Sequence, residues 1–171
     1  MSDRPGDGPR VTCERVGEQA RPVVERLAQL ERHDLSGLGG WVPGDDGLFE
    51  VPRLHRFFDE PDHDAYLVRS DDALAGFALV RPFEDGAHFI HSFFVVRSLR
   101  RHGVGRAAAG QLIRGTGGLW AIAFLEEYAA AGAFWRTVAR DVAGQRWTEG
   151  RRTSPDEKQV FSWIEIDLPH V

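Results

Sequence analysis

The chain contains little cysteine, little lysine and no asparagine, and these shortages exclude several classes of protein. Cys13 is the only cysteine among 171 residues, which rules out an internal disulfide and fits a reducing cytoplasm. Lys158 is the only lysine, so no glycine-rich stretch is followed by the lysine that a Walker phosphate loop requires. No apolar run approaches the roughly 18 residues that a membrane-spanning helix needs, and no G-x-S-x-G hydrolase turn occurs. We therefore expect a cytoplasmic protein with no membrane partner.

The remaining composition is that of one globular domain. An apolar fraction of 42%, with 11% aromatic residues, is sufficient for a sizeable core in a chain of this length. We expect residues 11–171 to form a single domain. Residues 1–10 are polar, lack an apolar signal core and are expected to be a disordered tail. Cys13 lies in an expected first strand, where we interpret it as a buried structural thiol.

The charge is unevenly divided along the chain. The formal net charge is −5, but residues 1–89 carry −8 and residues 90–171 carry +3. The basic half contains the glycine-rich segment described next. This division suits an anionic cofactor and a cationic or amine acceptor, although a solvated acidic surface explains part of it equally well.

The most informative segment runs from Phe93 to Ala108. An apolar run ends in an arginine-rich turn, Gly103 and Gly105 follow, and an alanine-rich helix begins at once. Glycines let main-chain N–H groups approach an anion, and a helix N-terminus adds partial positive charge. Arginines at positions 100, 101 and 106 add cations suited to phosphate oxygens. The segment therefore predicts a turn that binds a diphosphate.

Two kinds of glycine-rich loop remain as interpretations of this turn. Residues 103–108 fit the dinucleotide fingerprint G-x-G-x-x-A, but six residues separate Val96 from Gly103, and that fold places its glycines right after the strand. The alternative is Arg-x-x-Gly-x-Gly, made of Arg100, Gly103 and Gly105, which resembles the coenzyme A pyrophosphate loop of the GNAT acyltransferase superfamily. An ordinary strand-to-helix turn with solvated arginines is the structural alternative.

The flanking sequence strengthens the resemblance. The helix expected after a buried strand at 118–125 contains Ala131 and Phe134-Trp135, where the superfamily has N-x-x-A-x-x-[FL]-[YW]. Residues 73–80 resemble the strand that precedes the cofactor strand. The likeness extends over roughly residues 10–168, and it is nearest to a bacterial branch with E-F-F-V before the loop and F-W-R after it.

The resemblance implies an α/β fold whose central sheet is mixed, mostly antiparallel, splayed at the cofactor strand and flanked by helices. Residue patterns place strands at residues 11–16, 65–69, 73–81, 87–96, 118–125, 146–151 and 159–166. The last two strands flank a turn at Ser154-Pro155-Asp156. Helices are expected at 18–33, where Val23, Val24, Leu27 and Leu30 form an apolar row at helical spacing, around 54–58, at 104–115 and from 128. A loop is expected at 36–47.

The resemblance also implies acetyl-CoA as the acyl donor and suggests which residues bind it. The carbonyl and the pantetheine arm would lie along the main chain of Phe94, Val95 and Val96, whose side chains are then plain core. The pyrophosphate would lie on the turn formed by Arg100, Arg101, His102, Gly103, Val104, Gly105 and Arg106. Trp135 completes the expected cofactor site.

The expected proton-transfer residues depart from the family's pattern. The similar branch has a glutamate immediately before F-F-V, but this chain has Ser92, and a serine cannot take a proton from an ammonium near neutral pH. Our candidates for the base are His91, which needs a bulge to point into the site, and Glu126; a structural imidazole and a solvated strand-end carboxylate are the alternatives. Many members have a tyrosine where this chain has Trp135. Tyr128 is therefore our candidate acid, and a pocket-filling role for it is equally open.

The acceptor is expected to enter beside the acidic, glycine-rich loop at residues 36–47. Trp41 offers a cation–π face there, and Asp45 and Asp46 would attract a cationic amine; a solvated surface loop is the alternative. We expect no metal, because His88 and His91 are three apart on a strand and face opposite ways.

We predict an acyl-CoA-dependent N-acyltransferase that moves an acetyl group directly to a small amine. One alternative is a GNAT-fold enzyme that takes an aminoacyl group from tRNA, with a basic path made of arginines 136, 140, 146, 151 and 152. The overall negative charge argues against it. The other is a non-catalytic coenzyme A-binding module. A homodimer is also open, because GNAT proteins often pair through terminal strands.

Overall fold

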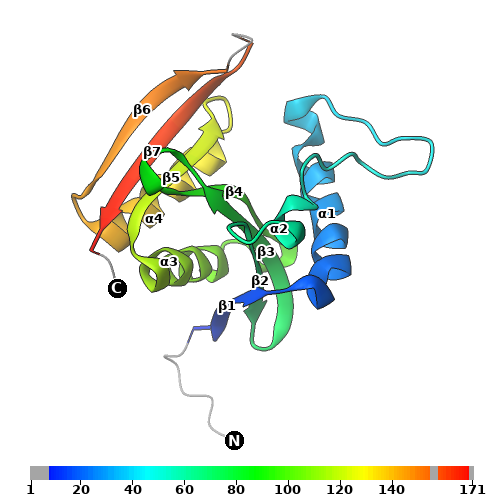
Figure 1. Cartoon of the computed structure of the whole chain (residues 1–171), viewed down its shortest axis with the longest axis horizontal. Helices are drawn as coiled ribbons and strands as arrows, with labels where there is room; N and C mark the ends of the chain where they lie inside the picture. The colour runs from blue at the N-terminus through cyan, green and yellow to red at the C-terminus, as the bar shows by residue number, and fades with distance from the viewer. Residues whose placement is uncertain (1–7, 155–157, 170–171) are drawn as a thin grey trace, which may run out of the picture.

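The computed structural model describes residues 8–154 and 158–169 and contains a seven-stranded sheet flanked by helices (Figure 1). The strands are β1 (Val11–Val16), β2 (Asp64–Ser70), β3 (Ala73–Pro82), β4 (His88–Val95), β5 (Gly118–Leu125), β6 (Trp147–Thr153) and β7 (Val160–Leu168). The helices are α1 (Arg21–Gly39), α2 (Arg56–Asp59), α3 (Val104–Thr116) and α4 (Ala129–Ala143). Short 3₁₀ turns lie at Glu18–Ala20, Glu84–Gly86 and Arg97–Leu99.

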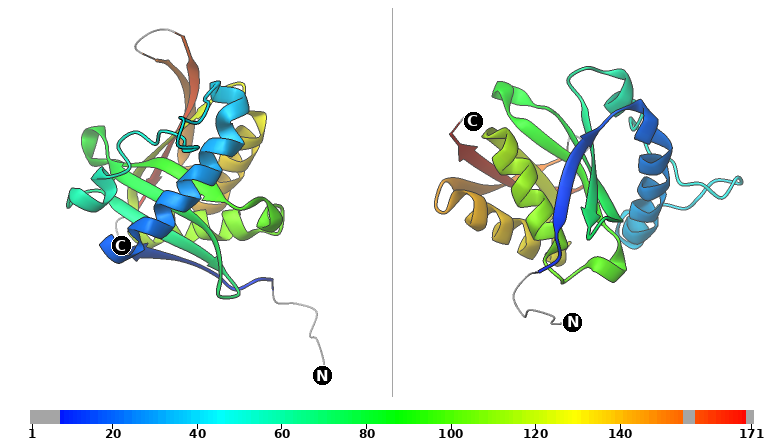
Figure 2. Two further views of the ribbon diagram at one scale, coloured as in Figure 1. Left: turned by 90° about the vertical axis from the view of Figure 1, so that its right-hand side faces the viewer. Right: turned by 90° about the horizontal axis from the view of Figure 1, so that it is seen from below.

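The sheet has the strand order β1-β2-β3-β4-β5-β7-β6, and only the β4–β5 pair is parallel. This arrangement confirms the expected α/β fold with a mixed, mostly antiparallel sheet. A parallel pair needs a crossover, and the α3 helix supplies it. The view from below shows α1 on one side of the sheet and α3 with α4 on the other (Figure 2).

Each face of the sheet has its own core. On the α1 face, Val24 and Leu27 of α1 and Phe57 of α2 pack on Phe77 and Phe94 of the sheet. The opposite face packs α3 and α4 against β5 and β7, with Ile113, Val138, Trp120, Ile122 and Ile164 fully buried. Burial of this many large apolar side chains, each contributing roughly 1.5–3 kcal/mol, holds the two helical layers to the sheet.

The strands β4 and β5 separate soon after they begin. Their pairing consists of His88 with Trp120, Phe89 with Ala121 and Ile90 with Ile122, and ends there within the described residues. Beyond Ile90, the edge of β4 that faces β5 therefore has no strand partner. This is the expected splay at the cofactor strand.

A bulge in β4 lies at the point of separation. Leu79 of β3 pairs with Ser92 and Val80 pairs with Ile90, which leaves His91 as an extra residue. An inserted residue interrupts the alternation of side chains, so His91 and Ser92 lie on the same face of the sheet. Phe57 of α2 packs 5.1 Å from the His91 ring, which places both residues on the α1 face.

The structure corrects several element boundaries. The first helix extends to Gly39, so residues 36–39 of the expected loop are helical, and Gly40 ends the helix at φ +67°. Leu30, expected on the apolar row of this helix, is 50% exposed. Arg10, expected in the tail, is held by Asp71 and Asp72. The remainder of that tail, residues 1–7, and positions 155–157 of the expected turn lie outside the described residues.

Candidate active site

A cleft of about 870 Å³ opens where β4 and β5 separate. Its walls are the C-terminal half of α1, the edge of β4, the end of β5, the loop before α3 and the start of α4. Side chains from both faces of the sheet therefore meet along one continuous groove. A groove of this size fits an extended ligand together with a second, smaller one.

The unpaired edge of β4 offers main-chain hydrogen-bonding groups to this cleft. The Val96 N–H donates to Ala75 O of β3, at 2.8 Å. Because main-chain groups alternate in direction along an antiparallel strand, Phe94 also faces β3, while Phe93 and Val95 face the cleft. The structure therefore keeps Val95 as a candidate to bind an extended ligand and adds Phe93. The main-chain groups of Phe94 and the N–H of Val96 face β3, and the Val96 carbonyl accepts a hydrogen bond from the Leu99 N–H.

The loop before α3 forms an anion-binding geometry. Arg101 and Gly103 have positive φ angles of 63° and 80°, and the first intrahelical bond runs from the Ala107 N–H to Gly103 O. No side chain caps the helix, so the N–H groups of its first turn point outward without a partner in the helix. Val104 is fully buried and His102 is exposed outside the cleft lining, so main-chain groups are what both can contribute.

The three arginines of this loop have different environments. Arg100 donates from Nε to Val95 O at 2.6 Å and from its terminal nitrogen to Asp34 of α1 at 2.5 Å. Arg106 forms a bidentate pair with Asp141 of α4. Arg101 is exposed, lines the cleft and has no carboxylate partner among the described residues. Arg101 is therefore the cation most available to a bound anion.

Aromatic side chains form the wall on the α4 side. Trp135 is buried and meets Phe93 and Phe134 edge to face, with ring centroids 5.3 and 4.8 Å apart. A Cβ on Gly105 would lie 3.3 Å from the Phe134 ring. Gly105 therefore permits the close packing of α3 on this wall, in addition to any approach to an anion.

His91 lines the cleft on the α1 face, where the bulge places it. Burial lowers its pKa to about 4, and the positive charges of Arg81 and Arg32 act in the same direction. The imidazole is therefore neutral at physiological pH and binds a proton weakly. This protonation behaviour makes His91 a poor match for a base that must accept a proton near neutral pH.

A carboxylate that sequence reasoning missed lies beside these residues. Glu31 on α1 lines the cleft together with Ser92, whose hydroxyl is close enough to lower the pKa of the Glu31 carboxyl. Burial raises the pKa of Glu31 to about 7, while the Ser92 hydrogen bond and the charge of Arg32 act in the opposite direction. The side chain nevertheless keeps part of its surface open to the cleft.

The other two candidate proton-transfer residues lie at the end of β5. Tyr128 is half-buried, lines the cleft and accepts main-chain hydrogen bonds from Ala131 and Gly132 at the start of α4. Glu126 is exposed, is not part of the cleft wall and pairs with Arg151 at 2.6 Å. The structure therefore brings Tyr128 together with His91 and Glu31 in the cleft, and directs Glu126 elsewhere.

The expected acceptor loop contributes only in part. Trp41 lines the cleft mouth, but the guanidinium of Arg32 lies 4.3 Å from its ring centroid and takes one face of the indole. Asp45 and Asp46 are exposed on the far turn of the loop, outside the cleft wall, and Asp46 accepts a hydrogen bond from the Leu48 N–H. Because neither carboxylate lines the cleft, the structure does not place them in direct contact with a ligand bound there.

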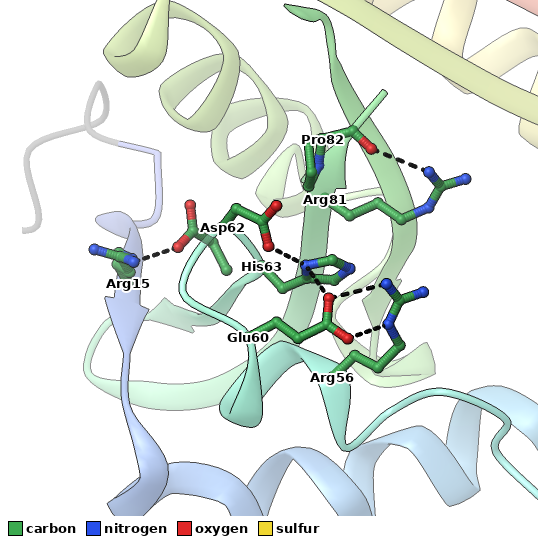
Figure 3. Close-up of polar contacts among 8 residues, drawn as sticks. Arg15, Arg56, Glu60, Asp62, His63, Arg81 and Pro82 are labelled. Carbon is green, nitrogen blue, oxygen red and sulfur yellow. Dashed lines mark hydrogen bonds and ion pairs between the residues drawn. The ribbon is translucent and has the colours of Figure 1, made fainter. Parts of the chain in front are cut away.

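A separate polar cluster supports α2. Figure 3 shows the His63 ring between the carboxylates of Asp62 and Glu60, with Glu60 also held by the fork of Arg56. Their potential ligand atoms lie within 4.8 Å of one another. Because Glu60 is committed to Arg56 and His63 to Asp62, we interpret the cluster as an ion-pair network. The Phe57 ring packs against the rings of His63 and His91, with centroids 5.1 Å apart in each pair. Through Phe57, the network is therefore in contact with His91 of the cleft wall.

Comparison with known proteins identifies the family of this architecture. The model of the acetyltransferase (GNAT) family matches residues 25–137, which include most of α1, all of β4, the arginine-rich loop and the first half of α4. No curated protein sequence matches the chain. Within the described residues, no helix combines the length and apolar character that crossing a membrane would require.

Solved structures share the fold over nearly the whole chain. The ribosomal-protein-S18-alanine N-acetyltransferase of Escherichia coli is 13% identical and matches with a TM-score of 0.63, covering 95% of this chain and 96% of that one. A protein of Bacillus anthracis, named as a streptothricin acetyltransferase and solved with acetyl coenzyme A, is 10% identical and matches with a TM-score of 0.62. The match covers 95% of this chain and 100% of that one. A ribosomal L7/L12 α-N-protein acetyltransferase in complex with coenzyme A is 12% identical and matches with a TM-score of 0.64. The match covers 92% of this chain and 94% of that one.

Proposed function

This chain belongs to the acetyltransferase (GNAT) family, and from that premise we propose that it transfers the acetyl group of acetyl-CoA to the nitrogen of a small amine. The family makes the protein an acyltransferase. The donor and the acceptor are inferences from the cleft. Acetyl-CoA supplies the activated acyl group, and two of the similar structures contain it or coenzyme A.

The observation that carries the proposal is the alignment of two binding elements along one groove. The free edge of β4 presents the main-chain groups of Phe93 and the N–H of Val95, which suit the amides of a pantetheine arm; the Val95 carbonyl already accepts a hydrogen bond from Arg100. The uncapped N-terminus of α3, with Arg101 beside it, suits a pyrophosphate. An extended ligand with amides at one end and phosphates at the other fits both elements at once.

On this proposal the reacting carbonyl lies near the bulge in β4, between the α1 and α4 walls. Holding the amine and the thioester together there supplies much of the rate, since effective molarities of positioned reactants are large. Tyr128 is our candidate to give a proton to the departing thiolate, because it lines the cleft and carries an O–H. Glu126 is not part of this arrangement, since Arg151 holds it outside the cleft wall.

The acceptor proposed is a small amine that reaches the cleft past Trp41 and Glu31. An acidic group on that wall favours a cationic acceptor. We place the enzyme in the cytoplasm, since its only cysteine, Cys13, cannot form an internal disulfide and fits a reducing compartment. A homodimer would use the edge strands β1 or β6.

Titration calorimetry with acetyl-CoA, followed by a thiol-release assay over a panel of primary amines, tests the proposal. We expect saturable binding in the micromolar to millimolar range and release of coenzyme A with at least one amine. Binding without turnover would identify a non-catalytic module. Absence of binding would contradict the assigned groove.

A further inference from the structure

Glu31 places a carboxylate on the acceptor side of the cleft, at a position of helix α1 where an apolar side chain would be expected. It lies on the row of α1 that faces the sheet, one turn after Leu27 and one turn before Leu35. Leu27 belongs to the core under this helix, and Leu35 lines the cleft. Burial of a glutamate in such a row costs folding free energy unless neighbouring groups interact with its carboxylate.

The partner of Glu31 is the residue at which β4 changes direction. Because His91 is the inserted residue of the bulge, Ser92 turns to the α1 face and its hydroxyl reaches Glu31. Two residues further along the strand lies Phe94, and Phe93 between them has its main-chain groups on the cleft edge. A carboxylate held at Ser92 is therefore adjacent to the proposed site of the acyl carbonyl.

We propose that Glu31 is the catalytic base of this enzyme and that Ser92 positions it. The assignment rests on the proposed acyl transfer to an amine. Glu31 thus supplies from helix α1 the carboxylate that the similar branch carries on the strand at the position of Ser92.

The step balances as follows. The Glu31 carboxylate takes one proton from the ammonium form of the acceptor, directly or through one water. The neutral nitrogen then forms a bond to the acyl carbon while the carbon–sulfur bond breaks. The sulfur leaves with its electron pair and is protonated from Tyr128, and the remaining extra proton of the amide nitrogen re-protonates Tyr128 through solvent.

The groups around Glu31 account for its suitability as a general base. The charged, titratable and hydrogen-bonding groups that line the same cleft wall are Arg32 and Asp34 of α1, His91 and Ser92 of β4, and Arg100 of the loop. Asp34 and Arg100 pair with each other, and Tyr128 lines the cleft at the start of α4. Burial raises the pKa of Glu31 to about 7, whereas His91 is held at about 4. A base is most effective when its pKa lies near the working pH, which favours Glu31.

The first test compares Glu31→Gln with Glu25→Gln, a matched change of an exposed glutamate on the same helix. With acetyl-CoA and the best amine of the panel, Glu31→Gln should lower kcat by about 10²–10⁴-fold, the usual loss for a general base. Glu25→Gln should stay within about threefold of the wild type. Acetyl-CoA affinity, measured by calorimetry, should be unchanged in both variants.

The second test moves the carboxylate between helix and strand. The double variant with Glu31→Ser and Ser92→Glu should have a kcat at least tenfold higher than that of Glu31→Gln, because a carboxylate again occupies the same space. Ser92→Ala alone should raise the pKa of Glu31, since the hydroxyl now lowers it, and should shift the acid limb of the kcat/KM profile to higher pH.

A third test needs no turnover. In protein labelled with ¹³C at glutamate carboxyls, the resonance that disappears in Glu31→Gln should titrate near pH 7, and addition of coenzyme A should leave it in place. Titration at the ordinary glutamate pKa of about 4.3 would count against the assignment.

The outcomes separate the two proposals. An active wild type with an equally active Glu31→Gln variant overturns the base and leaves the acyl transfer intact. A swap no more active than Glu31→Gln, or a loss traced to weaker acetyl-CoA binding, shows a structural role and also overturns it. A wild type that neither binds acetyl-CoA nor turns over any amine overturns the proposed function, and the catalytic role of Glu31 with it.

Discussion

At the scale of single residues, Glu31 shows what sequence can and cannot predict. Its spacing of seven from Val24 and four from Leu27 puts it on the buried row of α1, so a carboxylate at an apolar position was a readable signal. The sequence pattern instead assigned that row to Leu30, which is 50% exposed. The contact with Ser92 could not be predicted, because it depends on the bulge at His91 and on how α1 packs across the sheet.

The raised pKa of Glu31 predicts a stability that depends on pH. A carboxyl whose pKa is raised on folding stabilises the protein below its unfolded pKa of about 4.5, and this contribution is lost as the pH rises through 7. Glu31→Gln should therefore gain roughly 3–4 kcal/mol in unfolding free energy relative to the wild type at pH 8, but little at pH 4.5, because the pKa rises from 4.5 to about 7 and each pKa unit corresponds to about 1.4 kcal/mol. Urea unfolding at both pH values measures it. A difference that does not change with pH would contradict the shift.

Arg101 should matter more to coenzyme A than Arg106. Arg101 lines the cleft and has no carboxylate partner in the described part of the chain, whereas Arg106 is held by Asp141. We expect Arg101→Ala to weaken coenzyme A binding by about 10-fold, the value of a charge-assisted hydrogen bond, and Arg106→Ala to have a smaller effect. Calorimetry at low and high salt provides the measurement. A larger loss of coenzyme A affinity in Arg106→Ala than in Arg101→Ala would contradict the prediction and would indicate that the phosphates bind nearer to α4.

At the scale of elements, the strands and the two helices around the cofactor loop were predicted within a few residues. Alternation of apolar residues and turn signals such as Asp71-Asp72 are local, so they mark strands reliably. Register is set by tertiary pairing, and that is why the sequence assigned Phe94 and Val96 to the cleft edge that Phe93 and Val95 form. The main-chain groups of a strand carry no signature in its side chains.

The close pairing of β3 with β4 makes Gly76 a sensitive position. A Cβ on Gly76 would lie 1.9 Å from the carbonyl oxygen of Phe94, which is main chain and cannot move aside cheaply. We expect Gly76→Ala to destabilise the protein by about 1–3 kcal/mol and to weaken coenzyme A binding in the fraction that stays folded. Gly150→Ala on β6, where nothing lies within 4 Å, is the control. Equal unfolding midpoints for the two variants would refute the prediction.

At the scale of the whole molecule, the unequal division of charge is visible in the sequence but its pairing is not. Three of the five arginines considered as a path for RNA form ion pairs: Arg136 with Glu149, Arg151 with Glu126 and Arg152 with Glu165. These partners come from other elements, so only the folded structure brings them together. The basic half of the chain is therefore largely neutralised where RNA would have to bind.

We accordingly expect no useful affinity for tRNA. At about 150 mM salt a protein of net charge −5 with paired arginines should show no retention of tRNA at micromolar concentration in a filter-binding assay. Saturable binding with a steep salt dependence would instead favour the aminoacyl-tRNA alternative.

The contact of Asp34 with Arg100 links the two halves of the reaction. Burial disfavours the Asp34 carboxylate, but hydrogen bonds from Arg100 and Arg97 outweigh burial and lower its pKa. Asp34 lies three residues after Glu31, and Arg100 also holds Val95 O at the edge of β4. A donor that settles on the loop therefore also fixes the helix that receives the acceptor. Linkage makes such an influence reciprocal, so each substrate should bind more tightly when the other is present.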